Sequence, residues 1–294
     1  MHRFDTKADK IFVAIVYIIL GIVAFLVLYP LYFVIIASIS DPKEIAAGAV
    51  VLLPKGFNAE GYITVFKDPS IMTGYANSIY YSSLGTLVSV LVTLFIAYPL
   101  SRKEFMGRGF IMFLFTVTMF FGGGMIPTFI TVRNYGLINK VWALVLPGAA
   151  GVFNVIIART FIQTTIPNEL KEAADMDGCN HFYFFFRILV PLAKPIIAVL
   201  ALNALVRHWN SYLPPLLYMR DDSRYPLQVV LRSILIQHEA NDIALDAESL
   251  MSQYELAEKL KYSLIIVASI PVLCIYPFIQ KYLVKGMMLG SIKG

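Results

Sequence analysis

Long apolar stretches separated by short polar intervals dominate this sequence. A helix needs about 20 residues to cross the hydrocarbon core of a bilayer, and six stretches reach or approach that length. We expect membrane spans at residues 11–37, 76–100, 110–130, 141–161, 191–217 and 262–282. The pattern therefore predicts an all-α membrane protein with six transmembrane helices in one domain over residues 1–294.

Basic residues beside the spans indicate how the chain is oriented, because cytoplasmic loops carry an excess of Lys and Arg. With six spans and a cytoplasmic amino terminus, the inner side holds Arg3, Lys7, Lys10, Arg102, Lys103, Arg108, Lys281, Lys285 and Lys293. The outer segment 218–261 is rich in Asp and Glu, whereas the short outer turn with Arg133 and Lys140 departs from the rule. We therefore predict that both termini are cytoplasmic, with a tail at residues 283–294.

Composition supports a bilayer location and weakens other classes of protein. Of the 294 residues, 58% are hydrophobic and 15% are charged, and the mean hydropathy is +0.71, which is too apolar for a soluble domain of this size. The net charge of +5 is explained by cations that orient helices rather than by nucleic-acid binding. The two Cys and four His residues match no metal spacing. A membrane enzyme would need a catalytic cluster, and a secondary carrier would need acidic residues within its spans.

Glycine and proline interrupt two of the predicted spans. Gly122 to Gly124 and Pro127 lie in the third span, where a hinge or a close helix contact is favoured over a phosphate loop, since no Lys-Ser or Lys-Thr follows. Pro147, Gly148 and Gly151 weaken the fourth span and permit a break or close packing there.

The polar interval at residues 162–190 is predicted to form a cytoplasmic loop of two helices. Pro167 suits a helix start, residues 168–176 favour a helix, and Gly178 tolerates the positive φ of a sharp turn. A second helix at residues 180–189 would lead into the span that Pro191 opens. The side chains of Ala173 and Ala174 are small enough to let the backbone of another protein come close.

This interval resembles the EAA loop of ABC-importer permeases, in which Glu-Ala-Ala is followed by Gly and then by Ile-x-x-Pro. The matching residues are Glu172, Ala173, Ala174, Asp177, Gly178, Ile188 and Pro191. The resemblance implies a MetI-like type I importer fold in which the helix pair of the loop enters a cleft on an ATP-binding subunit. In that role Glu172 would pair with a basic or hydroxyl group, and the alternative is a solvated helix Glu. The aromatic run 182–186 would anchor the loop at the membrane face or fill the ATPase cleft.

Further stretches resemble carbohydrate permeases of the maltose MalG type: residues 77–78, 97–102, 280–286 and 290–294. Others resemble permeases of alginate-type and pectin-type importers: residues 122–127, 142–144, 159–161, 208–211 and 226–228. Two residues depart from the pattern. Cys179 stands where a small residue such as Ala is usual, and Arg207 stands where a smaller residue is expected.

The resemblance implies a bacterial cytoplasmic (inner) membrane protein that forms half of a translocation path for an oligo- or polysaccharide. Its partners would be a second homologous permease, two ATP-binding subunits and an extracytoplasmic solute-binding protein. The chain has no phosphate-cradling Gly-x-x-x-x-Gly-Lys-Ser/Thr sequence, so we expect no enzyme activity and no cofactor of its own, with ATP and Mg²⁺ held by partner subunits. The alternative functions are import of another small solute or a secondary carrier.

Two further groups of residues are candidates for function. In the tail, Lys285, Gly286, Gly290 and Lys293 are expected by resemblance to reach the ATPase subunits, the alternative being a frayed terminus. For the substrate path the candidates are Asn154, Asn203, His208, Trp209, Asn210 and Tyr212. A polar group at this depth faces a cavity or a partner helix, so packing against the second permease is the alternative for these residues.

Overall fold

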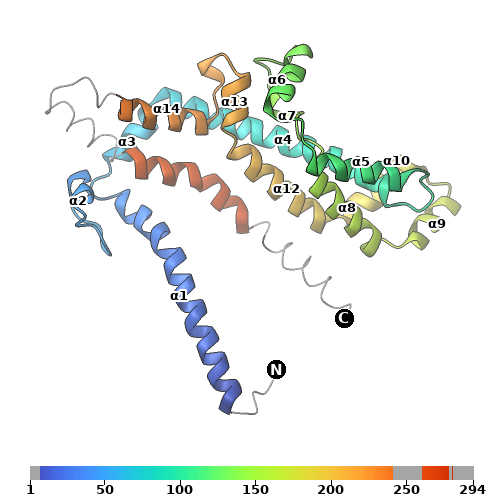
Figure 1. Ribbon diagram of the computed structural model, residues 1–294, viewed down its shortest axis with the longest axis horizontal. Coiled ribbons are helices and arrows are strands. Elements are labelled where there is room, and N and C mark those ends of the chain that lie inside the picture. The colour runs from blue at the N-terminus through green and yellow to red at the C-terminus, as the bar shows by residue number, and fades with distance from the viewer. Residues whose placement is uncertain (1–6, 241–259, 278–279, 281–294) are drawn as a thin grey trace. The chain divides into compact units, whose positions relative to one another are not determined.

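The computed structural model describes residues 7–240, 260–277 and 280, and these residues form helices and connecting segments without a β-strand (Figure 1). The chain divides into two compact units, one of residues 1–69 and 233–270 and one of residues 70–232 and 271–294. The predicted fold class is thus confirmed as all-helical for the described part of the chain.

The apolar stretches and the polar loop both became helices, with these bounds: α1 Lys7–Ala37, α2 Pro42–Ala46, α3 Glu60–Lys67, α4 Pro69–Ser101, α5 Arg108–Phe120, α6 Met125–Asn134, α7 Trp142–Val145, α8 Val152–Thr165, α9 Asn168–Met176, α10 His181–Tyr183, the π-helix η1 Phe184–Leu189, α11 Val190–Leu192, α12 Lys194–Trp209, α13 Leu213–Tyr218, the 3₁₀ turn η2 Asp222–Arg224, and α14 Leu227–Ala240. A further helix covers Leu260–Pro277.

In the first unit, α1 exposes apolar side chains along most of its length, and burial begins only at Ile36 and Ala37. A helix whose apolar side chains are exposed along most of its length is suited to contact with lipid. Past its end the chain turns back, and the Tyr62 hydroxyl donates a hydrogen bond of 2.7 Å to Ser38 Oγ. The helices α2 and α3 lie in the stretch between α1 and α4.

In the second unit, α4 presents a stripe of small and hydroxyl side chains at helical spacing. The buried stripe is Ser78, Ser82, Gly85, Ser89 and Thr93. Small residues let two helices approach closely within a membrane. At Gly85 the approach is tightest, because a Cβ added there would lie 2.5 Å from Nε2 of His208 on α12. The stripe therefore determines how closely α12 packs on α4.

The first half of α4 is joined by hydrogen bonds to the segment that precedes α14. The Asn77 side chain donates to the carbonyl oxygens of Ser223 and Tyr225 at 2.8 and 3.1 Å, and the backbone N–H of Leu227 donates to Ser78 Oγ at 2.8 Å. The segment also holds Asp221, whose pKa is lowered by hydrogen bonds from Ser223. Two stretches noted for their resemblance, 77–78 and 226–228, are thus brought together.

Among the described residues, three helices are long and apolar enough to cross a membrane: α1, α4 and Leu260–Pro277. Two bent pairs raise the number to five if each pair counts as one span. The bend between α5 and α6 is 117°, and the bend between His181–Leu192 and α12 is 82°. Gly122 to Gly124 lie in the first bend, where Gly124 has φ +81°. In the predicted fourth span, α7 and α8 are separate helices, and Gly148, with φ +87°, lies between them.

One apolar cluster holds the second unit together. Its buried members come from α4, α8, α9, η1 and α12, and they are Leu94, Ala97, Tyr98, Ala158, Ile162, Ile166, Ala174, Phe184, Phe185, Leu189, Ala193, Ile196 and Leu200. The cluster joins the end of α4 to the polar loop that follows α8. Consequently the loop is packed onto the membrane helices rather than suspended from them.

We predict that Gly85→Ala lowers the thermal stability of the detergent-solubilised protein, because overpacking a tight contact costs about 1–3 kcal/mol. Gly21→Ala in α1 is the matched control, since a Cβ at Gly21 has no neighbour within 4 Å. Combining Gly85→Ala with His208→Ala should recover part of the loss, because the two side chains occupy the same space. A melting temperature unchanged by Gly85→Ala alone would contradict this packing.

Candidate functional site

The helix α9 forms in the polar loop and is closed by a glycine turn. Pro167 precedes its first residue with φ −59° and ψ 149°, an extended conformation that suits the residue before a helix. After Met176 the chain reverses at Gly178, whose φ is +73°. The backbone N–H of Cys179 donates to the carbonyl of Ala174 at 2.9 Å, which ties the turn to the end of the helix.

The two alanines of the Glu-Ala-Ala sequence face in different directions. Ala174 is 7% exposed and belongs to the apolar cluster, whereas Ala173 and Glu172 are exposed, and Met176 is 89% exposed. The expectation that both alanines are bare for a partner therefore has to be corrected for Ala174. Its small side chain lets α9 lie against its own subunit, and the opposite face of α9 is the one open to another protein.

The second half of the loop is not the single helix predicted at residues 180–189. Asn180 caps α10 by accepting a hydrogen bond of 2.8 Å from the backbone N–H of Tyr183. The chain then passes through the π-helix η1 and through α11, which contains Pro191, before it bends into α12. Ile188 packs partly buried against the apolar cluster. Pi-helical turns are rare and are often found at functional positions.

The aromatic run 182–186 is divided between two environments. Phe185 stacks on Phe95 with ring centroids 4.8 Å apart, and Phe184 stacks on Tyr98 at 6.0 Å. Both stacked rings from the run are buried within the subunit. The two roles predicted for the run, membrane anchoring and filling an ATPase cleft, therefore remain for the exposed members Phe182, Tyr183 and Phe186.

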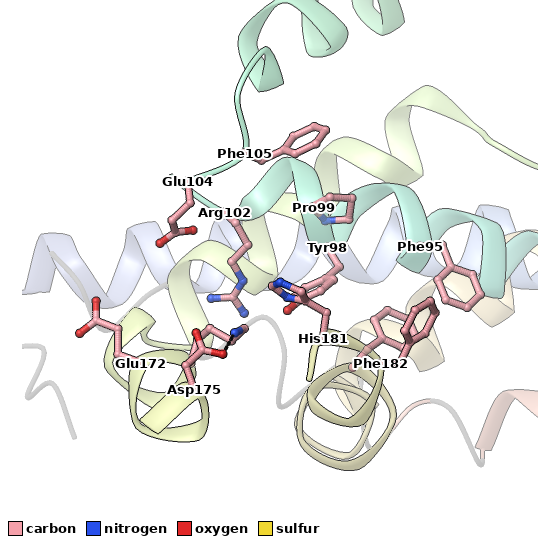
Figure 2. A pocket seen from close by; sticks show the side chains of 12 residues that line it. Phe95, Tyr98, Pro99, Arg102, Glu104, Phe105, Glu172, Asp175, His181 and Phe182 are labelled. Carbon is pink, nitrogen blue, oxygen red and sulfur yellow. Dashed lines mark hydrogen bonds and ion pairs between the residues drawn. The ribbon is translucent and has the colours of Figure 1, made fainter. Parts of the chain in front are cut away.

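A cavity of about 640 Å³ lies between the end of α4 and the loop helices α9 and α10 (Figure 2). It is lined by Phe95, Tyr98, Pro99, Arg102, Glu104, Phe105, Lys171, Glu172, Asp175, His181, Phe182 and Phe185. Figure 2 shows the Arg102 side chain extending from α4 toward α9, which carries Glu172 and Asp175. The cavity thus combines an aromatic wall with charges of both signs.

Arg102 lines this cavity although the sequence indicated only a loop-orienting cation within the stretch 97–102, and not a site residue. It is 7% exposed, and its guanidinium lies 5.1 Å from the ring centroid of Tyr98 and 5.4 Å from that of Phe184. Nη1 donates to Oδ1 of Asn168 at 3.3 Å, while Nε and Nη2 are buried without a partner within the described residues. Arg102 therefore links α4 to α9 and keeps unused donors.

Lys171 and Asp175 form an ion pair one helical turn apart on α9. Lys171 is 8% exposed and its Nζ lies 5.6 Å from the ring centroid of Phe184, so both buried cations of the site are stacked on the same aromatic group. Glu172 lies on the exposed side of the helix. The site offers buried donors behind a rim that carries carboxylates.

The candidate residues for the substrate path do not form one cluster. His208 packs against Gly85, and Trp209 is 4% exposed and meets Tyr75 edge to face at 5.6 Å. Asn203 and Asn210 are exposed on this subunit.

The remaining two candidates, Asn154 and Tyr212, have other neighbours. Asn154 is on α8, beside Gly151, and Tyr212 lies under the guanidinium of Arg232 at 4.3 Å from the ring centroid. The tail candidates Lys285, Gly286, Gly290 and Lys293 lie outside the described residues. Within the described residues, no group of three or more His, Cys, Asp or Glu is placed to hold a metal ion.

The chain matches a known protein family over nearly its whole length. The family model described as binding-protein-dependent transport system inner membrane component matches residues 2–289. The chain belongs to this family. Among curated relatives of the permease, the protein LplC of Bacillus subtilis (strain 168) is 37% identical over 100% of this chain and 98% of its own length. The polygalacturonan/rhamnogalacturonan transport system permease protein YtcP of the same organism is 39% identical over 97% and 99%.

A solved structure agrees with this assignment of the permease. A bacterial ABC transporter involved in the import of the acidic polysaccharide alginate matches with a TM-score of 0.85 and 32% identity, over 96% of this chain and 100% of that chain. The resemblance on which the sequence prediction rested is thereby confirmed. The permease is an inner-membrane component with a MetI-like helical fold and several membrane-crossing helices.

We predict that Arg102→Gln speeds backbone hydrogen exchange in α9 about tenfold relative to the unmodified permease. The change removes the stacking on Tyr98 and Phe184, and an effect of this size corresponds to about 1.4 kcal/mol of local stability. Lys103→Gln is the control, because Lys103 is a neighbouring cation that is exposed. Equal exchange rates for α9 in both variants would show that Arg102 does not hold the loop.

Proposed function

We propose that this permease forms half of the translocation path of an ABC importer for an oligo- or polysaccharide, with alginate-like or pectin-like saccharides as the candidate substrates. The observation that carries the proposal is the packing of α9 onto the membrane helices through Ala174. The kinds of substrate named for the permease YtcP and for the alginate importer support the saccharide class. The second candidate, a secondary carrier, lacks support because α4, α5, α6, α8 and α12 contain no Asp or Glu.

The proposed topology has six spans with both termini in the cytoplasm and α9 on the cytoplasmic side. In this topology, three spans are not single helices. The bent pair of α5 and α6 forms the third span, α7 and α8 form the fourth, and the bent pair that ends in α12 forms the fifth. Irregular backbone within a membrane is tolerated where it is buried in protein or lines a water-filled cavity. Such breaks therefore belong on the faces toward a second permease and the path, rather than toward lipid.

The conformational change of the ATPase is proposed to reach the permease through α9. Two ATP-binding subunits hold ATP and Mg²⁺, and one of them grips the exposed face of α9 that carries Glu172 and Ala173. The opposite face is fixed to α4, α8 and α12 by the apolar cluster. A push on the loop is therefore transmitted to the membrane helices rather than absorbed by a flexible linker.

The cavity beside α9 is proposed to take a polar or acidic side chain of the ATPase. The buried donors Nε and Nη2 of Arg102 support this, since an unpaired buried donor costs free energy until a partner satisfies it. In the same assembly, Lys285, Gly286, Gly290 and Lys293 of the tail reach the ATPase subunits. An extracytoplasmic solute-binding protein delivers the saccharide from the other side, and Asn203 and Asn210 face the path.

Uptake by cells tests the proposal as a whole. A strain that lacks this permease should lose ATP-dependent uptake of the saccharide and regain it when the gene is restored. The purified protein should copurify with a second permease and an ATPase. Vectorial transport of solute by the purified chain alone, without any nucleotide-hydrolysing partner, would refute the proposed function.

We predict that Gly178→Trp abolishes saccharide uptake and substrate-stimulated ATP hydrolysis while membrane insertion persists. A Cβ at Gly178 meets no atom of its own subunit within 4 Å, so a bulky side chain there is obstructed chiefly by the partner. Gly136→Trp is the matched control, because Gly136 has φ +65° and the same open surroundings, and it carries the same backbone strain of about 1 kcal/mol. Equal transport by both variants would remove α9 from the ATPase contact.

A further inference from the structure

A polar face runs along α12 and is exposed on this subunit. Asn203, Arg207 and Asn210 are spaced by four and three residues, which places them on one side of the helix, and all three are exposed. His208 and Trp209 turn instead toward the interior of the subunit. A charged group on a membrane helix faces a water-filled path or a partner protein rather than lipid.

The guanidinium of Arg207 is held in place by two hydrogen bonds. Nη1 donates to the carbonyl oxygen of Gly148 at 2.6 Å, and Nη2 donates to Ser89 Oγ at 3.0 Å, with His208 Nε2 at 3.5 Å from Nη2. Gly148 lies in the break between α7 and α8, where backbone carbonyls are released from helical pairing. A guanidinium has five N–H donors, so most of the N–H donors of Arg207 remain for another acceptor.

If the predicted span 76–100 ends at the membrane surface, the hydrogen bond to Ser89 places Arg207 well inside the bilayer. Ser89 lies 12 residues before Ser101, the last residue of α4. At 1.5 Å per residue, this separation is about 18 Å along the helix, compared with about 30 Å for the thickness of the hydrocarbon core. An arginine at this depth cannot reach either interface by extending its side chain along the lipid.

No acidic residue lies in the described membrane helices of the unit that holds Arg207. The helices α4, α5, α6, α8 and α12 contain no Asp or Glu, and no ion pair joins Arg207 to an acidic residue in the described ranges. A desolvated charge without a counterion is costly. Within the described residues, the exposed guanidinium of Arg207 thus has room for an anionic partner.

We propose that Arg207 is a subsite for the carboxylate of a uronate residue as an acidic saccharide passes through the membrane. The guanidinium fork matches a carboxylate with two parallel hydrogen bonds, and the amides of Asn203 and Asn210 flank it as partners for sugar hydroxyls. The subsite selects acidic over neutral saccharides during translocation. This inference rests on the proposed function, because it specifies the class of saccharide that the same path carries.

The test uses the complete importer in proteoliposomes with saturating, preloaded binding protein. The substrates are an oligogalacturonide and its methyl ester, which have the same length and differ in charge. The affinity of the binding protein for each substrate is measured separately. We expect Arg207→Gln to lower the ratio of acidic to esterified uptake about tenfold, the usual effect of losing a charge-assisted hydrogen bond, and Arg207→Lys to retain most of the ratio.

Arg133→Gln is the control, because it removes an exposed cation at the end of α6, and it should leave the ratio unchanged. An equal loss of both substrates in Arg207→Gln would overturn the proposal and would indicate that Arg207 pairs with a carboxylate of the second permease. An unchanged ratio would overturn it as well. If the unmodified importer transports only the neutral ester, the subsite is refuted while the proposed function stands. If it transports neither saccharide, the subsite and the proposed function are both refuted.

Discussion

The burial of one face of α9 against its own subunit is the contact on which the rest of the structure depends. Ala174 contributes a side chain small enough for close approach, and Phe184 is a fully buried member of the same apolar cluster. Arg102 and Lys171 stack on the same ring. A loop of nine helical residues would be marginal alone in water. Attached in this way, it becomes a rigid extension of α4, α8 and α12.

The membrane part of the molecule depends on close packing without large side chains. The stripe of α4 lets α12 approach until Gly85 and His208 leave no room for a Cβ. In lipid, packing and hydrogen bonds hold helices together because the hydrophobic effect gives little preference between lipid and protein. The same approach brings Ser89 within reach of Arg207, so helix packing and the position of the intramembrane cation have one cause.

Much of the architecture follows from apolar run length, because a bilayer demands about 20 apolar residues per helix. That argument located α1, α4 and the helix at 260–277, and the turn at Gly178 follows from its chemistry. The direction in which the side chains of short helices face was harder to predict from the sequence. Ala173 and Ala174 are the same residue type, and only the packing of α9 against the apolar cluster decides which of them turns inward.

The aromatic run posed the same difficulty, since the π-helix at 184–189 changes the angular spacing of its side chains in a way that composition does not reveal. Arg102 was identifiable as a cation but not as a buried one.

Spin labels at Met176 on α9 and Thr160 on α8, in a variant without Cys179 and Cys274, test the central claim of rigid attachment most directly. We predict the same label-to-label distance in nucleotide-free and ATP-bound importer, while the distance from Met176 to a label on the second permease changes. A Met176–Thr160 distance that shifts with nucleotide would contradict the account.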